Sequence, residues 1–208
     1  MIFEAGQRVV FIGDSITDCG RRDEDPPFGN GYMNLVRAFV TARHPELGLT
    51  WLNRGISGNT VRELAERWHQ DAVQTGPDWL SVMIGINDVW RYFLDRESEA
   101  VPIDEYEETL RRLLREAVDQ TGCRLILADL YIIEPDLDEP QRVQSDRYGL
   151  VVEKLAGEFD AVHVRTQQAF DRVLAVTQPL DWADDRIHPN VAGHAVIAQA
   201  YLDAIGGD

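Results

Sequence analysis

The sequence predicts an α/β protein, a three-layer α/β/α sandwich with about five parallel strands. Short, uninterrupted apolar runs alternate with longer amphipathic segments along the chain. Buried parallel strands form continuous apolar runs, and their alternation with helices is typical of βα units. No repeat, low-complexity tract or linker interrupts this pattern, and 208 residues suit one domain. We therefore expect residues 1–208 to form a single domain.

Five apolar runs have the length and the flanking turn residues that strands require. In chain order the predicted strands are Arg8–Gly13, Thr50–Asn53, Trp79–Gly85, Arg124–Tyr131 and Ala161–Val164.

Helical periodicity and capping residues predict the helices between these strands. Thr60 and Glu63 have the spacing of a capping box, which marks a helix start. Asp104 with Glu107 predicts a second start, and Gly122 is placed to end that helix. The other predicted helices are Gly31–Arg43, Gln141–Gly157, Thr166–Thr177 and Val191–Ile205.

The composition argues against nucleic acids and membranes as partners. Twenty basic and 36 acidic residues give a net charge of -16, and such a surface repels phosphate backbones and anionic lipids. No window approaches the ~20 apolar residues of a spanning helix. The first residues lack the basic start and apolar stretch of a secretory signal, which predicts a cytoplasmic location.

The sequence predicts neither a metal nor a cofactor. Its two cysteines lack the spacing of metal ligands or of a disulfide framework. Asp184, Asp185, His188 and His194 could be combined as ligands only at spacings unlike those of metal motifs.

The first predicted strand ends in Gly13-Asp14-Ser15, which places a hydroxyl at the carboxyl edge of the sheet. Open α/β sheets bind their ligands at that edge. The segment differs from the G-x-S-x-G nucleophile elbow because its fifth position is Thr17. Taken alone, it is equally compatible with a turn in which Ser15 caps the next helix.

Two further loops follow predicted strands and should meet the same edge. Gly58 allows close approach of the backbone and lies just before a capped helix, where free amides suit an anion. Asn87 follows the third strand, and its side-chain amide can donate to an oxyanion without changing charge. The alternatives are a plain turn glycine and an Asx turn. We expect Asp88 to hold the loop rather than to perform chemistry.

Asp185 precedes His188 by three positions, just before the last predicted helix. A carboxylate beside an imidazole fixes its tautomer and stabilises the imidazolium. A serine, a histidine and an aspartate are the parts of a nucleophilic acyl-transfer site. Asp184 is adjacent, so which of the two carboxylates orients the ring stays open.

These four segments, in this order, resemble the four blocks of the SGNH/GDSL hydrolases. The blocks match Ser15 in Gly-Asp-Ser, Gly58 in Gly-Ile-Ser-Gly, Asn87 in Gly-Ile-Asn-Asp, and Asp185 with His188 in Asp-x-x-His. The resemblance implies the flavodoxin-like fold of that superfamily, with Ser15 as nucleophile and His188 as base. It also implies an oxyanion hole formed by the amides of Ser15 and Gly58 and the side chain of Asn87.

Nearly the whole chain is similar to the single-domain bacterial acetylxylan esterases of this superfamily. This similarity implies a homo-oligomeric serine carboxylic-ester hydrolase that removes short acyl groups, above all O-acetyl, from acetylated xylo-oligosaccharides through an acyl-enzyme. Trp90, Tyr92 and Trp182 are candidate sugar platforms. The relatives carry an aromatic residue directly before the orienting aspartate, where this chain has Asp184.

Two other functions fit the same scaffold. A thioesterase or lysophospholipase would favour an apolar channel, but the segments 21–27 and 134–141 are polar and acidic. A non-catalytic carbohydrate-binding protein would not need the catalytic side chains, and labelling of Ser15 by an organophosphate would distinguish it from an enzyme.

Overall fold

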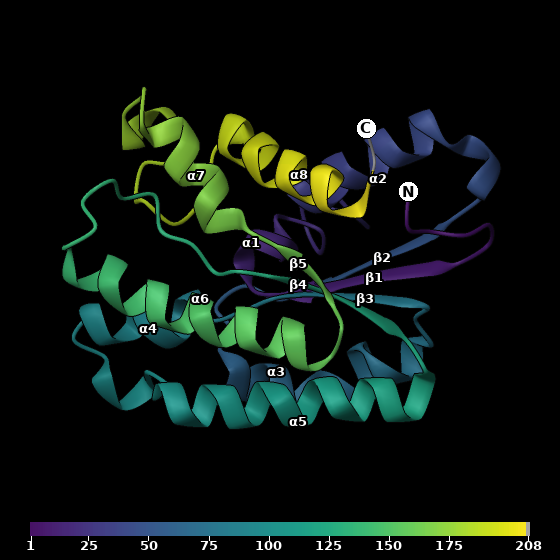
Figure 1. The fold of residues 1–208 in the computed structure, drawn as a ribbon, viewed down its shortest axis with the longest axis horizontal. Helices are drawn as coiled ribbons and strands as arrows, with labels where there is room; N and C mark the ends of the chain where they lie inside the picture. Colours follow the sequence, from purple (N-terminus) through teal and green to yellow (C-terminus); the bar gives the residue numbers. More distant parts are fainter. Residues whose placement is uncertain (207–208) are drawn as a thin grey trace.

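The computed structural model describes residues 1–206 and contains a five-stranded, entirely parallel sheet between two layers of helices (Figure 1). This arrangement confirms the predicted α/β/α fold. The spatial order of the strands is β2-β1-β3-β4-β5. Their bounds are β1 Arg8–Gly13, β2 Thr50–Gly55, β3 Trp79–Met83, β4 Arg124–Ala128 and β5 Val162–Val164.

The longer helices cover both faces of this sheet (Figure 1). One layer contains α2 (Tyr32–Arg43), α7 (Thr166–Leu174) and α8 (Val191–Ile205), and the other contains α3 (Val61–Asp71), α5 (Ile103–Thr121) and α6 (Pro140–Glu158). Two shorter helices, α1 (Ser15–Asp18) and α4 (Ile86–Phe93), follow β1 and β3. The short 3₁₀ helices are η1 Pro45–Leu47, η2 Val73–Thr75, η3 Glu97–Glu99 and η4 Pro179–Asp181. Within residues 1–206, no helix has the length and apolar character needed to cross a membrane.

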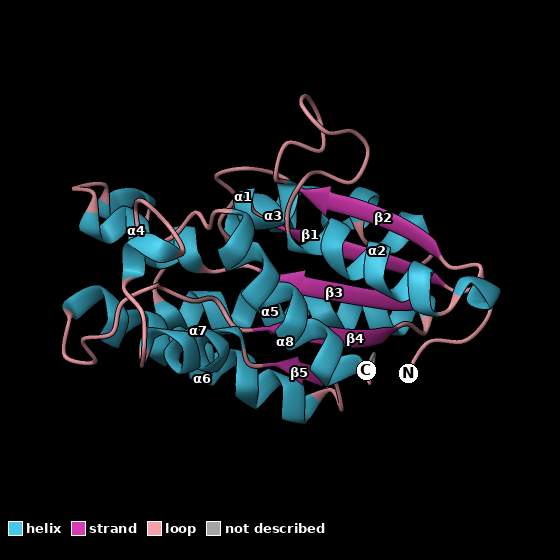
Figure 2. Cartoon of the chain, turned by 90° about the horizontal axis from the view of Figure 1, so that it is seen from above, coloured by secondary structure: helices cyan, strands magenta, loops and turns pink. Residues whose placement is uncertain are grey.

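The carboxyl ends of the central strands meet at one edge of the sheet. Gly13 at the end of β1 is in register with Gly55 on β2 and with Met83 on β3. Figure 2 shows the arrowheads pointing to the end of the molecule where α1 and α4 lie. The loops after these strands are therefore neighbours in space, although they are far apart in the sequence.

Two predicted strands extend beyond the sheet. The predicted strand Trp79–Gly85 ends at Met83, and Arg124–Tyr131 ends at Ala128. The apolar run continues after β4 because residues 130–133 are buried, but β5 has only three residues and offers no further pairing. The amide of Ile132 bonds instead to the side chain of Gln167 at 2.9 Å.

The capping residues predicted one helix start correctly and a second wrongly. Thr60 and Glu63 form the expected capping box at α3. The predicted start at Asp104 is wrong, because α5 begins at Ile103 after Pro102 and has no side-chain cap. Gly122 does end that helix, with a left-handed φ of 70°. At the other end of the chain, α7 stops at Leu174, three residues before the predicted end.

Candidate functional site

The first candidate residue, Ser15, lies where β1 ends and α1 begins. A Cβ atom on Gly13 would lie 2.2 Å from the carbonyl oxygen of Met83, so only glycine fits at this close approach of two strands. The carboxylate of Asp14 accepts a hydrogen bond of 3.0 Å from the amide of Ile16 and caps α1. Ser15 is therefore the first residue of the helix and not its cap, which leaves its hydroxyl free to bond elsewhere.

The structure brings Ser15, His188 and Asp185 into a continuous chain of contacts. The Oγ atom of Ser15 lies 3.0 Å from Nε2 of His188, and Nδ1 of His188 lies 2.6 Å from Oδ2 of Asp185. The other carboxylate oxygen of Asp185 accepts a bond of 2.7 Å from the backbone amide of His188. Among residues 1–206, the carboxylate in contact with the imidazole is that of Asp185 and not that of Asp184.

Hydrogen bonds keep Asp185 ionised. Partial burial raises the pKa of this carboxyl, but bonds from the His188 ring and from the amides of His188 and Ile187 outweigh the burial. The pKa of Asp185 is therefore lower than its ordinary value. A carboxylate in this position can accept the Nδ1 proton of His188 and leave Nε2 available to Ser15.

The buried segment after β4 supports the loop that precedes α8. The hydroxyl of Tyr131 donates to the carbonyl of Ile187 at 3.1 Å, and the amide of Ile133 donates to the carbonyl of Arg186 at 2.8 Å. Arg186 has a left-handed φ of 68° and forms an ion pair of 2.7 Å with Glu134. These supporting residues were not predicted, because their apolar run was interpreted only as part of a strand.

Asn87 bonds to the loop that contains Gly58, through the neighbouring residue Asn59. Gly58 is exposed and has a φ of +82°, the left-handed conformation that favours glycine. Asn87 is 7% exposed, and its Nδ2 atom donates to the carbonyl of Asn59 at 3.0 Å. An amide nitrogen carries two hydrogens, so Nδ2 keeps a second one for another acceptor.

Helix α4 holds this loop through two further side chains. The carboxylate of Asp88 accepts from the amide of Val61 at 3.0 Å, as expected for a residue that fixes the loop. Arg91 donates to the carbonyl of Gly58 at 2.6 Å and is paired with Glu63 at 3.3 Å. Asn87 lies one turn before Arg91 on the same helix. It therefore contacts a loop that Asp88 and Arg91 hold in position.

Two buried carboxyl groups beside the site have unusual proton affinities. Burial raises the pKa of Asp14 to about 7, although the amide of Ile16 and the charge of His188 act in the opposite direction. Burial also raises the pKa of Asp88 to about 7, partly offset by the bond from Val61. Both groups therefore hold a proton in the folded protein at a pH where they are ionised in the unfolded chain.

We expect Asp88→Asn to change the pH dependence of stability. The pKa of Asp88 in the folded state is above its value in the unfolded chain. Asp88 therefore contributes to the free energy of unfolding a stabilising amount that is fully present below pH ~4 and is lost as the pH rises through about 7. The free energy of unfolding of the wild type minus that of Asp88→Asn should therefore be smaller at pH 8 than at pH 5. Urea denaturation at both values measures this difference in the free energy of unfolding, with the exposed Asp184→Asn as control. A difference that does not change with pH would contradict the raised pKa of Asp88.

The three candidate aromatic residues lie in different places. The Trp90 ring packs edge-on against the His188 ring, with 5.6 Å between their centroids. Tyr92 lies two residues further along α4, about 200° around the helix, and its ring packs against Phe93. Trp182 lines a groove between α7 and α8. Of the three, Trp90 is the one with a ring contact to His188 within the described chain.

The site contains the groups that acyl transfer needs. A histidine contacts a serine hydroxyl, a carboxylate contacts the histidine, and donors lie on the neighbouring loop and helix. Within residues 1–206, no group of three or more histidine, cysteine or carboxylate side chains is arranged to hold a metal ion.

Comparisons with known proteins point to one family. The sequence matches the GDSL-like lipase/acylhydrolase family over residues 11–196. It is 45% identical over 209 residues to an acetylxylan esterase from Geobacillus stearothermophilus, and the alignment covers 97% of this chain and 95% of that protein.

Solved structures agree with the sequence match. The crystal structure of Axe2, an acetylxylan esterase from Geobacillus stearothermophilus, has a TM-score of 0.94 and 45% identity, covering 99% of this chain and 97% of that one. The crystal structure of LAE5, an alpha/beta hydrolase from the metagenome of Lake Arreo in Spain, has a TM-score of 0.95 and 42% identity, covering 100% of this chain and 98% of that one.

Proposed function

This chain belongs to the GDSL-like lipase/acylhydrolase family, and we propose that it is a serine esterase that removes acetyl groups from acetylated xylo-oligosaccharides. The observation that carries the proposal is the chain of contacts from Ser15 through His188 to Asp185. It occurs in a protein that is similar to an acetylxylan esterase along nearly its whole length.

In the proposed mechanism, Nε2 of His188 takes the proton of the Ser15 hydroxyl as Oγ attacks the ester carbonyl. Asp185, held as a carboxylate, stabilises the imidazolium that forms. The tetrahedral intermediate collapses, His188 gives its proton to the departing sugar hydroxyl, and the acetyl group remains on Ser15. Water activated by His188 then attacks the acyl-enzyme and releases acetate.

The negative charge of the tetrahedral intermediate is assigned to three donors: the amides of Ser15 and Gly58 and the side chain of Asn87. The Ser15 amide lies at the start of α1, where helix geometry leaves backbone amides without an intrahelical partner. The second hydrogen of Asn87 Nδ2 is free to reach the same oxygen. The contacts of α4 with the Gly58 loop keep these donors in place before substrate binds, which is the condition for effective electrostatic stabilisation.

Solved structures of the relative support these roles. They include catalytic mutants of Axe2 in which alanine replaces one serine, one aspartate or one histidine. The replaced aspartate lies three positions before the replaced histidine in that protein, as Asp185 does before His188 here.

A turnover series tests the substrate. We expect kcat/KM to fall as the acyl chain of p-nitrophenyl esters is lengthened from acetate to octanoate, and we expect acetate to be released from acetylated xylo-oligosaccharides. The Ser15→Ala protein is the matched control for background hydrolysis. If kcat/KM instead rises up to octanoate and acetylated oligosaccharides are untouched, the protein is a thioesterase or lysophospholipase.

Asn87→Ala should lower kcat by about 10²–10³-fold with little change in KM, as removal of one oxyanion donor does. The side chain acts on charge that develops in the transition state, so substrate binding should be nearly unaffected. Steady-state kinetics with p-nitrophenyl acetate separates the two parameters. A change confined to KM would mean that Asn87 contacts the bound ester rather than the oxyanion.

We also infer that the protein is a homo-oligomer, from its similarity to acetylxylan esterases. Sedimentation velocity at micromolar concentration measures the number of subunits.

A further inference from the structure

A small recess lies along the outer edge of β2, the edge strand next to β1. Its volume is about 200 Å³, and its lining includes two arginines, Arg21 and Arg54. The rest of the wall is largely apolar and includes Pro26, Phe28 and Trp51. Two arginines therefore line the same hollow as aromatic and proline residues.

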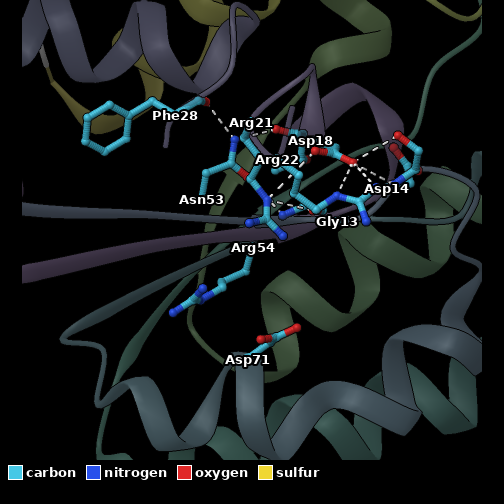
Figure 3. Close-up of polar contacts among 12 residues, drawn as sticks. Gly13, Asp14, Asp18, Arg21, Arg22, Phe28, Asn53, Arg54 and Asp71 are labelled. Carbon is cyan, nitrogen blue, oxygen red and sulfur yellow. Dashed lines mark hydrogen bonds and ion pairs between the residues drawn. The ribbon is translucent and has the colours of Figure 1, made fainter. Parts of the chain in front are cut away.

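The hydrogen bonds within residues 1–206 leave donors of both arginines without a partner. Arg21 donates through Nε to the carbonyl of Gly55 at 2.8 Å, and its nearest carboxylate oxygen, on Asp18, is 3.9 Å away. The Nε atom of Arg54 is buried and has no hydrogen-bond partner in the part of the chain that the structure describes. Figure 3 shows the Arg54 side chain extending away from Asp18 and Arg22, with no dashed line at its guanidinium.

The carboxylates closest to the recess are engaged with other groups, apart from Oδ1 of Asp18, which has no hydrogen-bond partner among residues 1–206. Asp18 is paired with Arg22 at 2.8 Å and also accepts from the amide and the hydroxyl of Ser57. Asp71 is paired with Arg67 at 3.0 Å. Exposed carboxylates occur at positions 23–25 on the same loop as Arg21, but they do not line the recess.

The two guanidinium groups also disfavour each other. Burial and the charges of Arg54 and Arg22 lower the pKa of Arg21, while Asp18 and Asp71 act in the opposite direction. Like charges held together with unfilled donors cost free energy unless an anion binds between them. This surplus of positive charge is the more unusual in a chain with a net charge of -16.

The recess is close to the esterase site. Arg54 immediately precedes Gly55, which is in register with Gly13 two residues before Ser15. Neighbouring strands are ~4.8 Å apart. Arg21 lies three residues after the end of α1, the helix that begins with Ser15. A sugar bound in the recess can therefore belong to the same oligosaccharide as the ester at Ser15.

We propose that the recess between Arg21 and Arg54 binds the carboxylate of an acidic sugar, a uronic-acid unit attached to the oligosaccharide. Paired guanidinium groups suit the planar carboxylate, and the apolar wall formed with Pro26, Phe28 and Trp51 suits the face of a sugar ring. The volume is below the roughly 300 Å³ at which drug-sized pockets begin, which fits one ring rather than a longer chain. The choice of a sugar rests on the function proposed for Ser15.

Titration calorimetry on the full chain tests this proposal without using catalysis. The probes are glucuronic acid, neutral xylose and inorganic phosphate. We expect glucuronate to bind more tightly than either of the others and to bind more weakly as salt is added. Arg54→Gln should weaken glucuronate binding roughly tenfold or more, because bonds to charged groups are the stronger ones. Arg54→Lys should recover part of the loss.

The matched control is Arg147→Gln, which removes an exposed arginine on α6 and should leave glucuronate binding unchanged. Arg54 is preferable to Arg21 for the variants because its Nε atom has no hydrogen-bond partner among residues 1–206, whereas Nε of Arg21 bonds to the carbonyl of Gly55. Thermal unfolding shows that each variant is folded.

Equal binding of xylose or phosphate, or wild-type affinity in Arg54→Gln, would overturn the proposal. Each of these results would leave the esterase assignment intact, whereas failure of ester hydrolysis would not change the binding result.

Discussion

Ser15→Ala is expected to lower kcat by several orders of magnitude, the largest effect of any single substitution in this protein. The substitution removes the only protein oxygen that forms a bond to the acyl carbon in the proposed mechanism. Loss of a triad nucleophile elsewhere costs about 10⁶-fold, and the residual rate comes from the oxyanion donors and from binding. Initial rates with p-nitrophenyl acetate measure the change.

The fold should survive this substitution. Ser15 is partly exposed, and within residues 1–206 its hydroxyl bonds only to His188, while α1 keeps its cap from Asp14. Circular dichroism and the midpoint of thermal unfolding should therefore match the wild type. A folded Ser15→Ala protein that keeps more than a few per cent of the activity would contradict the assignment of the nucleophile.

Asp185→Asn should give the second largest effect, a loss of about 10⁴-fold in kcat, as seen when a triad aspartate is replaced in this way. Asparagine can turn its NH₂ group toward Nδ1 of His188, which favours the tautomer with a proton on Nε2. That tautomer cannot accept the proton of Ser15.

Asp184→Asn is the matched control, since it makes the same chemical change one residue away. The carboxylate that lies 2.6 Å from Nδ1 of His188 is that of Asp185, so Asp184→Asn should keep nearly full activity. Equal losses in both variants would indicate a shared role, and the reverse ranking would move the orienting role to Asp184.

The positions of the candidate residues could be predicted because each of them lies next to a predicted strand or helix. Ser15 directly follows a continuous apolar run, and Asp185 and His188 precede a helix at fixed spacing. In a parallel sheet the carboxyl ends of strands meet at one edge. The α/β pattern alone therefore brought the loops of Ser15, Gly58 and Asn87 together.

The supporting contacts could not be predicted, because they join residues that are distant in the sequence. The bond from Arg91 to the Gly58 carbonyl spans 33 positions, and the bond from Tyr131 to the Ile187 carbonyl spans 56. Helix α4 was missed because an Asn-Asp pair after a strand is also typical of a turn. Once α4 is known to be a helix, its 3.6-residue period separates Trp90 from Tyr92.

The most direct test of the account is covalent labelling of the nucleophile. The protein is incubated with an organophosphate ester, digested, and mapped by mass spectrometry. The account predicts a single adduct on the peptide that contains Ser15, its absence from Ser15→Ala, and loss of esterase activity in proportion to labelling. An active protein that stays unlabelled, or an adduct on another residue that accompanies the loss of activity, would contradict catalysis through Ser15.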